Sequence, residues 1–136
     1  MKKLLSTAYS DNAFNFAMLI QRVVTGLMLL IAHGLLKISN FSEMSGTFFD
    51  PLHIGHRNSL ALCIFSEVFC SMLLVLGLFT RLAALVIVLE LSFLVFMYHR
   101  GQPIKNLDLG IMYLTSAFSV LLLGPGRVRV DGMMSK

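Results

Sequence analysis

One apolar run with a single acidic residue inside it constrains this chain more than any other stretch. From Leu82 to Tyr98 the sequence contains no Gly, Pro or Asn, and its one charged residue is Glu90. As an α-helix that rises about 1.5 Å per residue, this run would be about 25 Å long, close to the hydrocarbon thickness of a bilayer. We therefore predict that it spans a membrane.

The carboxyl group of Glu90 needs an explanation within that span. An acid at mid-membrane costs about 2.5–3.5 kcal/mol, and each Leu, Ile, Val or Phe neighbour offsets about 0.3–0.6 kcal/mol of it. The span is therefore possible, but an ionisable group at this depth normally faces protein or a water-filled cavity and has a partner. We expect other helices to supply that partner.

The composition agrees with a membrane protein. Hydrophobic residues make up 57 % of the 136 residues and charged residues 13 %, against roughly 25 % charged in soluble domains. The mean hydropathy is +0.81. The net charge of +4 does not indicate nucleic acid, because the basic residues are spread over the ends of apolar runs and form no cluster. We predict one domain, residues 1–136, in contact with the lipid bilayer.

The pattern of apolar runs predicts an all-α membrane protein, an antiparallel four-helix bundle. The expected spans are about 14–36, 60–79, 82–98 and 107–123. A turn as short as Gly77–Arg81 makes the second and third spans an antiparallel hairpin. In the long connection after the first span, Phe41, Met44 and Phe48 are spaced for a short interfacial helix that Pro51 ends.

Loop charges predict the orientation of the bundle. Four spans place both termini on one side, and that side carries more basic residues than the other. The two sets are Lys2, Lys3, Arg81, Arg127, Arg129 and Lys136 with the termini, and Lys37, Arg57, Arg100 and Lys105 opposite. The positive-inside rule favours cytoplasmic termini.

Depth along the helices groups the buried polar residues into two layers. Arg22, Glu67 and Glu90 share the middle of the membrane, at about 12, 18–20 and 12–14 Å from the end with the termini. Two acids against one arginine leave one negative charge, so we expect one carboxyl to hold a proton. This inner network is either catalytic or a structural set of ion pairs. His33, Lys37, His99 and Asp108 form an outer layer.

The remaining candidates for metal or thiol chemistry are weak. Cys63 and Cys70 are seven residues apart, about 10.5 Å along a helix, which is too far for a disulfide, and we interpret them as small packing residues. His53 and His56 lack a carboxylate partner in their loop, so they are expected to be surface residues. We predict no metal site.

Several of these residues together resemble the DoxX family of small four-span membrane proteins. The matching pieces are Arg22 with Gly26, His33-Gly34 followed by Lys37, Glu67, Gly77-Leu-Phe-Thr-Arg81-Leu-Ala-Ala-Leu, His99 and Leu123-Gly-Pro-Gly-Arg127. The two Gly-containing segments at the third span's entry and the fourth span's exit are the most specific. Asp108 departs from the family pattern, which more often has Glu there.

The resemblance implies a multi-pass subunit in a bacterial inner membrane. Family members are similar to the small subunits of thiosulfate:quinone oxidoreductase and of terminal quinol oxidases, and others belong to oxidative-stress complexes. On this basis we expect a partner redox subunit and a bound quinone. The chain has no Rossmann fingerprint and no Cys-x-x-Cys, which favours a subunit over a complete enzyme.

Residue roles follow from that hypothesis. Arg22, Glu67 and Glu90 would be the catalytic proton network, and His33, Lys37, His99 and Asp108 would bind the quinone headgroup. The alternative for the outer layer is a snorkelling lysine with hydrogen-bonded histidines. Haem is disfavoured, because His33 and His99 are a single pair with mismatched helical angles. A non-catalytic scaffold that recruits a redox or stress-response partner remains the alternative function, and a homo-oligomer remains open.

Overall fold

The computed structural model describes residues 4–98, 100–101, 103–129 and 132–133, and within these residues it contains helices and no strands. Three helical rods are long and apolar enough to cross a membrane: Asp11–Ser39, His56–Leu76 and Thr80–Tyr98. A shorter apolar helical stretch covers Leu107–Leu123. The chain is therefore a multi-pass membrane protein, as the sequence predicted.

The first rod consists of α1 (Asp11–Met28), η1 (Leu29–Gly34) and α2 (Leu35–Ser39). It begins earlier than the predicted residue 14, because the Ser10 hydroxyl accepts a hydrogen bond from the Ala13 N–H and caps the helix. It also ends later than the predicted residue 36. That extra turn keeps Lys37 on a helix.

A single helical turn, α3 (Phe41–Met44), follows the first rod. The predicted interfacial helix was too long, since Phe48 and Pro51 lie beyond its end in non-helical chain. The second rod then consists of α4 (His56–Ile64), η2 (Phe65–Cys70) and α5 (Ser71–Leu76). It starts four residues before the predicted residue 60.

A left-handed glycine ends the second rod and makes the hairpin. Gly77 has φ 76°, a conformation that costs glycine little. The third rod, α6 (Thr80–Phe93) with η3 (Leu94–Tyr98), starts three residues later. The last long helix, α7 (Ile104–Leu123), has Gly124 with φ 84° as its C-cap, so the predicted end of the fourth span at residue 123 is confirmed.

Each of the three rods contains a π-helical segment, namely η1, η2 and η3. Such segments are rare and often coincide with functional sites, because the extra residue in the turn redirects the side chains around it. Here η1 carries His33 and η2 carries Glu67. Two of the three irregular turns therefore fall where the sequence analysis placed polar residues of interest.

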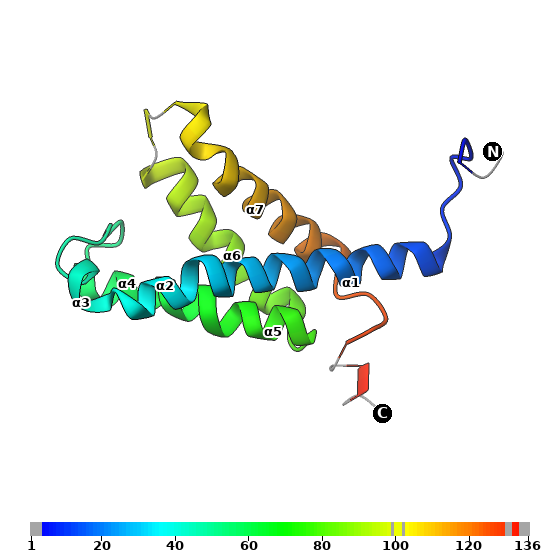
Figure 1. The fold of residues 1–136 in the computed structure, drawn as a ribbon, viewed down its shortest axis with the longest axis horizontal. Helices are drawn as coiled ribbons and strands as arrows, with labels where there is room; N and C mark the ends of the chain where they lie inside the picture. The colour runs from blue at the N-terminus through cyan, green and yellow to red at the C-terminus, as the bar shows by residue number, and fades with distance from the viewer. Residues whose placement is uncertain (1–3, 99, 102, 130–131, 134–136) are drawn as a thin grey trace.

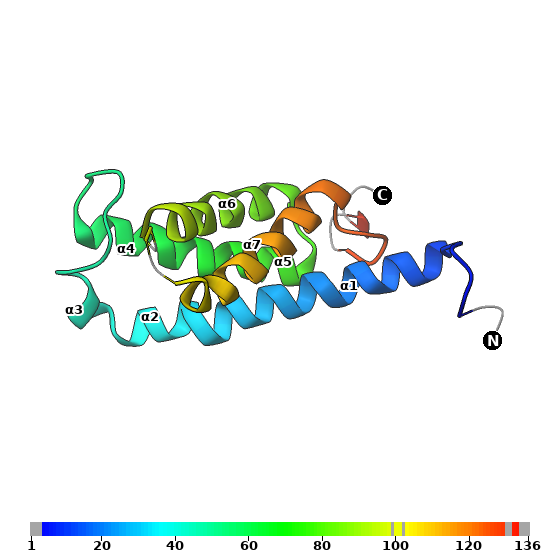
Figure 2. The same cartoon turned by 90° about the horizontal axis from the view of Figure 1, so that it is seen from above.

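The helices pack in pairs, α1 on α5 and α6 on α7, with α1 also against α7 (Figure 1). Seen from above, the start of α1, the end of α5 and the segment after α7 lie at one end of the bundle, and α3 lies at the other (Figure 2). We call these the α1-start end and the α3 end. The core between the helices contains Met18, Leu29, Cys70, Leu74, Ala83, Ala84, Ile87, Leu91, Ala117 and Val120.

Gly26 sets the distance between α1 and α5. A Cβ at this position would lie 2.6 Å from Val75 Cγ2 and 2.9 Å from the Ser71 carbonyl oxygen. Both distances are shorter than real contacts, so any side chain here must push the two helices apart.

We therefore expect Gly26→Val to destabilise the protein by about 1–3 kcal/mol, the usual cost of overpacking. Gly46→Val is the control, since a Cβ at Gly46 has nothing within 4 Å. Thermal unfolding of both variants in mild detergent, followed by circular dichroism, measures the difference. Equal melting temperatures would contradict close packing at Gly26.

Candidate functional site

A buried ion pair joins the first two rods near the α3 end. Lys37 on α2 places its Nζ 2.6 Å from Glu67 Oε2 on η2, and the side chains are 15 % and 2 % exposed. The two rods approach closely because Gly34 lies against the backbone of Glu67, where a Cβ would be 3.1 Å from the Glu67 carbonyl oxygen. Lys37 thus neutralises an acid that lies inside the bundle.

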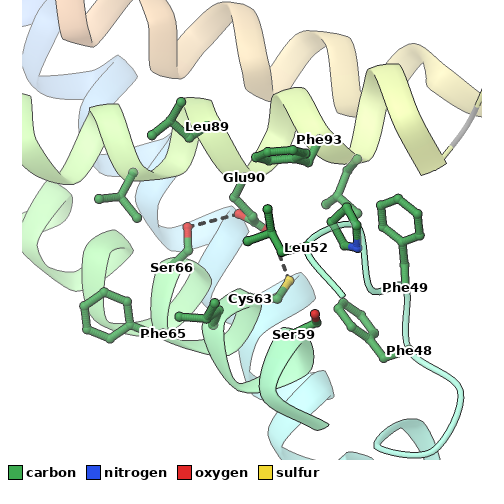
Figure 3. A pocket seen from close by; sticks show the side chains of 14 residues that line it. Phe48, Phe49, Leu52, Ser59, Cys63, Phe65, Ser66, Leu89, Glu90 and Phe93 are labelled. Atoms are coloured by element: carbon green, nitrogen blue, oxygen red, sulfur yellow. Dashed lines mark hydrogen bonds between the residues drawn. The ribbon is translucent and has the colours of Figure 1, made fainter. Parts of the chain in front are cut away.

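Glu90 on α6 reaches the same place from the third rod. Its Oε1 accepts a hydrogen bond from Cys63 Sγ at 2.9 Å, and its Oε2 accepts one from Ser66 Oγ at 3.1 Å (Figure 3). Ligand atoms of Cys63, Glu67 and Glu90 all lie within 4.8 Å of one another. We call Lys37, Cys63, Ser66, Glu67 and Glu90 the charged cluster.

The charged cluster has two carboxyl groups and one ammonium group. Within the part of the chain that the structure describes, the ammonium of Lys37 pairs with Glu67, and no cation lies within 4.0 Å of Glu90. With both acids ionised, the cluster carries one negative charge in surroundings of low dielectric constant. One proton shared by the two acids makes it neutral.

An apolar pocket of about 270 Å³ opens beside Glu90, between α4 and η2 on one side and α6 on the other. We call it the Glu90 pocket. Figure 3 shows Phe48, Phe49 and Leu52 of the loop after α3 and Phe93 of α6 around it, with Glu90, Ser66 and Cys63 in its wall. A mostly apolar lining with a few polar atoms is the usual character of a small-molecule site.

A second pocket, of about 330 Å³, lies beside Lys37. We call it the Lys37 pocket; its lining residues are Lys37, Met44, Thr47, Phe48, Phe49, Leu94 and Tyr98. Phe48, Phe49 and Leu94 line both pockets. The two aromatic residues of the loop therefore form part of a wall between two approaches to the charged cluster.

Asp50 fixes the loop that carries this aromatic pair. Its Oδ1 accepts hydrogen bonds from Ser59 Oγ at 2.6 Å and the Ile54 N–H at 3.0 Å, and its Oδ2 accepts one from the Gly55 N–H at 2.8 Å. The pKa of Asp50 lies below its ordinary value of 3.8 because of these hydrogen bonds, and the bond from Ser59 has the largest effect. The same hydrogen bonds also tie the loop to the first turns of the second rod.

The prediction that Arg22 pairs with Glu67 and Glu90 is wrong. The buried guanidinium donates instead to backbone carbonyls after α7, through Nη1 to Pro125 and through Nη2 to Val128 at 2.8 Å. The segment after Gly124 folds back under α1, and its bare carbonyl groups are the nearer acceptors. Glu67 finds its cation in Lys37, which the sequence analysis had placed in the outer layer.

The predicted headgroup residues do not surround one pocket. His33 is half-buried with its ring edge-on to Tyr113 of α7, at 5.3 Å between centroids. Asp108 is exposed near the start of α7 and accepts a hydrogen bond from the Leu109 N–H at 2.7 Å. Neither lines the Glu90 or the Lys37 pocket. His99 lies outside the described residues, and its predicted role stays a prediction.

Sequence reasoning missed the parts of Cys63 and Ser66. We interpreted Cys63 as a packing residue, yet its thiol donates to Glu90. A signal was available, since Cys63 and Glu67 occupy one helical stripe and both face the neighbouring span. Cys63, Glu67 and Glu90 are also the described residues whose atoms are close enough to share a metal ion, but a cation there competes with the Lys37 ammonium on Glu67.

The DoxX family model matches residues 17–100. The chain belongs to the DoxX family. The matched region contains all five residues of the charged cluster and all the residues that line the Glu90 and Lys37 pockets, whereas α7 lies beyond it. Neither the curated proteins nor the solved structures include a match to this chain.

Removing one partner of the ion pair should cost more than removing both. We expect Lys37→Met or Glu67→Gln alone to destabilise this DoxX protein by about 3–5 kcal/mol, because either leaves a buried group without its partner, and the double variant to recover much of that loss. Unfolding in mild detergent of the four proteins in this cycle measures the coupling. Lys105→Met, at an exposed site on α7, is the control, and additive losses would contradict the pairing.

Loss of the Asp50 acceptors should loosen the loop in a pH-dependent way. Because the pKa of Asp50 is lowered on folding, its contribution is complete above 3.8 and is lost as the pH falls through the lower folded value. We expect Asp50→Asn to reduce amide-exchange protection of Ile54 and Gly55 at pH 7, and the wild type to lose the same protection only below about pH 4. Glu43→Gln on α3 should change neither amide.

Proposed function

We propose that this DoxX protein is the membrane subunit of a quinone-linked oxidoreductase, and that the quinone headgroup binds in the Glu90 pocket. The observation that carries the proposal is an apolar pocket with an acid in its wall that has no cation partner among the described residues. A bound quinone would supply a carrier that gains two electrons and two protons on reduction to the quinol. The known tendency of the family towards membrane redox subunits supports the same assignment.

The pocket fits a flat ring with polar substituents. Its volume of about 270 Å³ is just below the range for small-molecule sites, about 300–1,000 Å³. Phe48, Phe49 and Phe93 provide aromatic faces for the ring. Leu62 and Leu89 at its rim are 52 % and 54 % exposed, so an isoprenoid tail could leave between them into the lipid.

The residues of the charged cluster would handle the protons. The Glu90 carboxyl and the Ser66 hydroxyl lie in the pocket wall, where they can hydrogen-bond to a ring oxygen. Glu90 would transfer a proton to or from that oxygen, and Glu67 with Lys37 would balance the charge left behind. The electrons would come from a partner redox subunit, because the sequence carries no cofactor-attachment motif of its own.

The membrane arrangement in this proposal has four spans. Leu107–Leu123 would be about 25 Å long, sufficient for most of the hydrocarbon layer, and α7 packs along α6 as a fourth antiparallel helix would. We further propose a bacterial inner membrane with cytoplasmic termini, which the balance of basic residues supports. The charged cluster would then lie towards the outer half of the bundle.

Quinone content of the purified protein tests the proposal. We expect near-stoichiometric quinone in solvent extracts of the wild type, measured by absorbance and mass. Glu90→Leu keeps the apolar volume but removes the polar anchor, so it should weaken quinone binding at least about tenfold, the loss that one hydrogen bond to a charged group can supply, and its quinone content should fall to about half that of the wild type or less. Glu90→Gln should retain the quinone and lose proton uptake on its reduction.

His33→Ala is the matched variant, since His33 lies outside the Glu90 pocket. It should keep its quinone. Loss in His33→Ala with retention in Glu90→Leu would return the site to the residues first expected from the sequence. An absence of quinone in the wild type, with an intact helical spectrum, would favour the alternative function, a non-catalytic scaffold for a redox or stress-response partner.

A further inference from the structure

A third pocket lies at the α1-start end of the bundle, away from the charged cluster. It has a volume of about 740 Å³ and combines residues around the start of α6 with residues after α7. Its lining residues are Asn15, Phe79, Thr80, Arg81, Leu82, Leu123, Gly124, Pro125, Gly126, Arg127 and Arg129. The two segments most specific to the family resemblance, far apart in the sequence, thus meet in one pocket that the proposed quinone chemistry does not use.

The pocket has an excess of positive charge. Arg81, Arg127 and Arg129 all line it. Among the described residues, Asp11 is the one carboxylate within ion-pair distance of these arginines, 4.0 Å from Arg127, and both of those side chains are mostly exposed. Such an exposed pair is weak and is easily exchanged for another anion.

Backbone geometry holds these arginines in place. Gly124 lies against the Arg81 side chain, since a Cβ there would be in ordinary van der Waals contact with Arg81 Nε, at 3.4 Å. The Arg127 N–H donates to Asn15 Oδ1 at 2.9 Å, and Arg129 Nη1 donates to the Gly126 carbonyl at 2.9 Å. Beneath them, buried Arg22 fixes the segment by its bonds to Pro125 and Val128.

The start of α6 adds hydrogen-bond donors to the same pocket. Its N-cap residue is Phe79, in a left-handed conformation and without a side-chain cap. The first N–H groups of a helix have no intrahelical acceptor, and together with the helix dipole they favour an anion. Residues 79–82 all line the pocket.

An unused buried hydroxyl is the second, independent sign of a ligand. Thr80 is 2 % exposed and lines the pocket, and its Oγ1 has no hydrogen-bond partner among the described residues. A buried hydroxyl without a partner costs about 1–3 kcal/mol. An anion in the pocket would accept its hydrogen bond.

We infer that this pocket binds the phosphate of an anionic phospholipid. Phosphate oxygens match arginine side chains, helix N–H groups and a hydroxyl. The pocket lies at the ends of the membrane-capable helices, at the level of lipid headgroups in a membrane. Phe79, Leu82 and Leu123 beside it are 59 %, 61 % and 51 % exposed, and these lipid-facing side chains favour an occupant with acyl chains over a free phosphate.

Lipid binding to the purified protein in detergent, measured by native mass spectrometry, tests this inference. We expect phosphatidylglycerol to bind at least about tenfold more tightly than phosphatidylcholine. Arg81→Gln with Arg127→Gln should weaken phosphatidylglycerol binding roughly 25-fold, about fivefold for each arginine. Arg100→Gln, an exposed arginine that follows the third rod, removes the same charge elsewhere and should leave binding unchanged.

Thr80→Val separates a ligand contact from a structural role. The substitution keeps the side-chain shape and removes a hydroxyl that has no partner, so the lipid-free protein should be at least as stable as the wild type, and phosphatidylglycerol binding should weaken about fivefold or more. Equal binding of the two lipids, or unchanged phosphatidylglycerol binding in the double arginine variant, would overturn the inference. If inorganic phosphate alone binds as tightly as phosphatidylglycerol, the assignment to a lipid is overturned.

Discussion

The ion pair between Lys37 and Glu67 is the interaction on which the α3 end of this protein depends. Within a bilayer there is no water to solvate a charged group, so the acid on the second rod needs a cation from another helix. Two features of the first rod supply this cation. The rod stays helical as far as Lys37, and Gly34 lets it touch the second rod. The third rod then adds Glu90, and the imbalance of two acids and one ammonium follows from the same geometry.

The buried charged residues of the bundle lie in two separate places. The acids and Lys37 lie towards the α3 end, whereas the buried Arg22 donates through Nη1 and Nη2 to carbonyl oxygens of the segment after α7. A guanidinium has five N–H donors and no acceptor, so backbone carbonyl groups can accept its hydrogen bonds in place of a carboxylate. Arg22 therefore acts as an anchor for the chain after α7, and the proton chemistry that we propose does not include it.

Much of the fold could be predicted from the sequence, and less of the site. Apolar runs and glycine stops located the helices to within a few residues, and Arg22, Gly26 and Leu29, which fall on one face at ideal helical spacing, are all buried. The pairing of charges was predicted wrongly, because depth on an ideal helix says nothing of a chain segment that folds back to supply carbonyl groups. The π-helical turns around His33 and Glu67 also redirect side chains in a way that a fixed angle of 100° per residue cannot represent. The role of the loop with Phe48 and Phe49 depends on long-range packing and had no local signature.

The shared wall of Phe48 and Phe49 has a consequence for how related proteins diverge. These rings belong to a loop tied down mainly through Asp50, while the acids beneath them belong to the helices. Exchanging the loop therefore alters the shape and width of both entrances without disturbing the polar groups or the packing of the rods. The shape of the entrances and the chemistry of the polar groups can thus evolve separately, and a transplanted loop offers an engineer a direct way to change one while keeping the other.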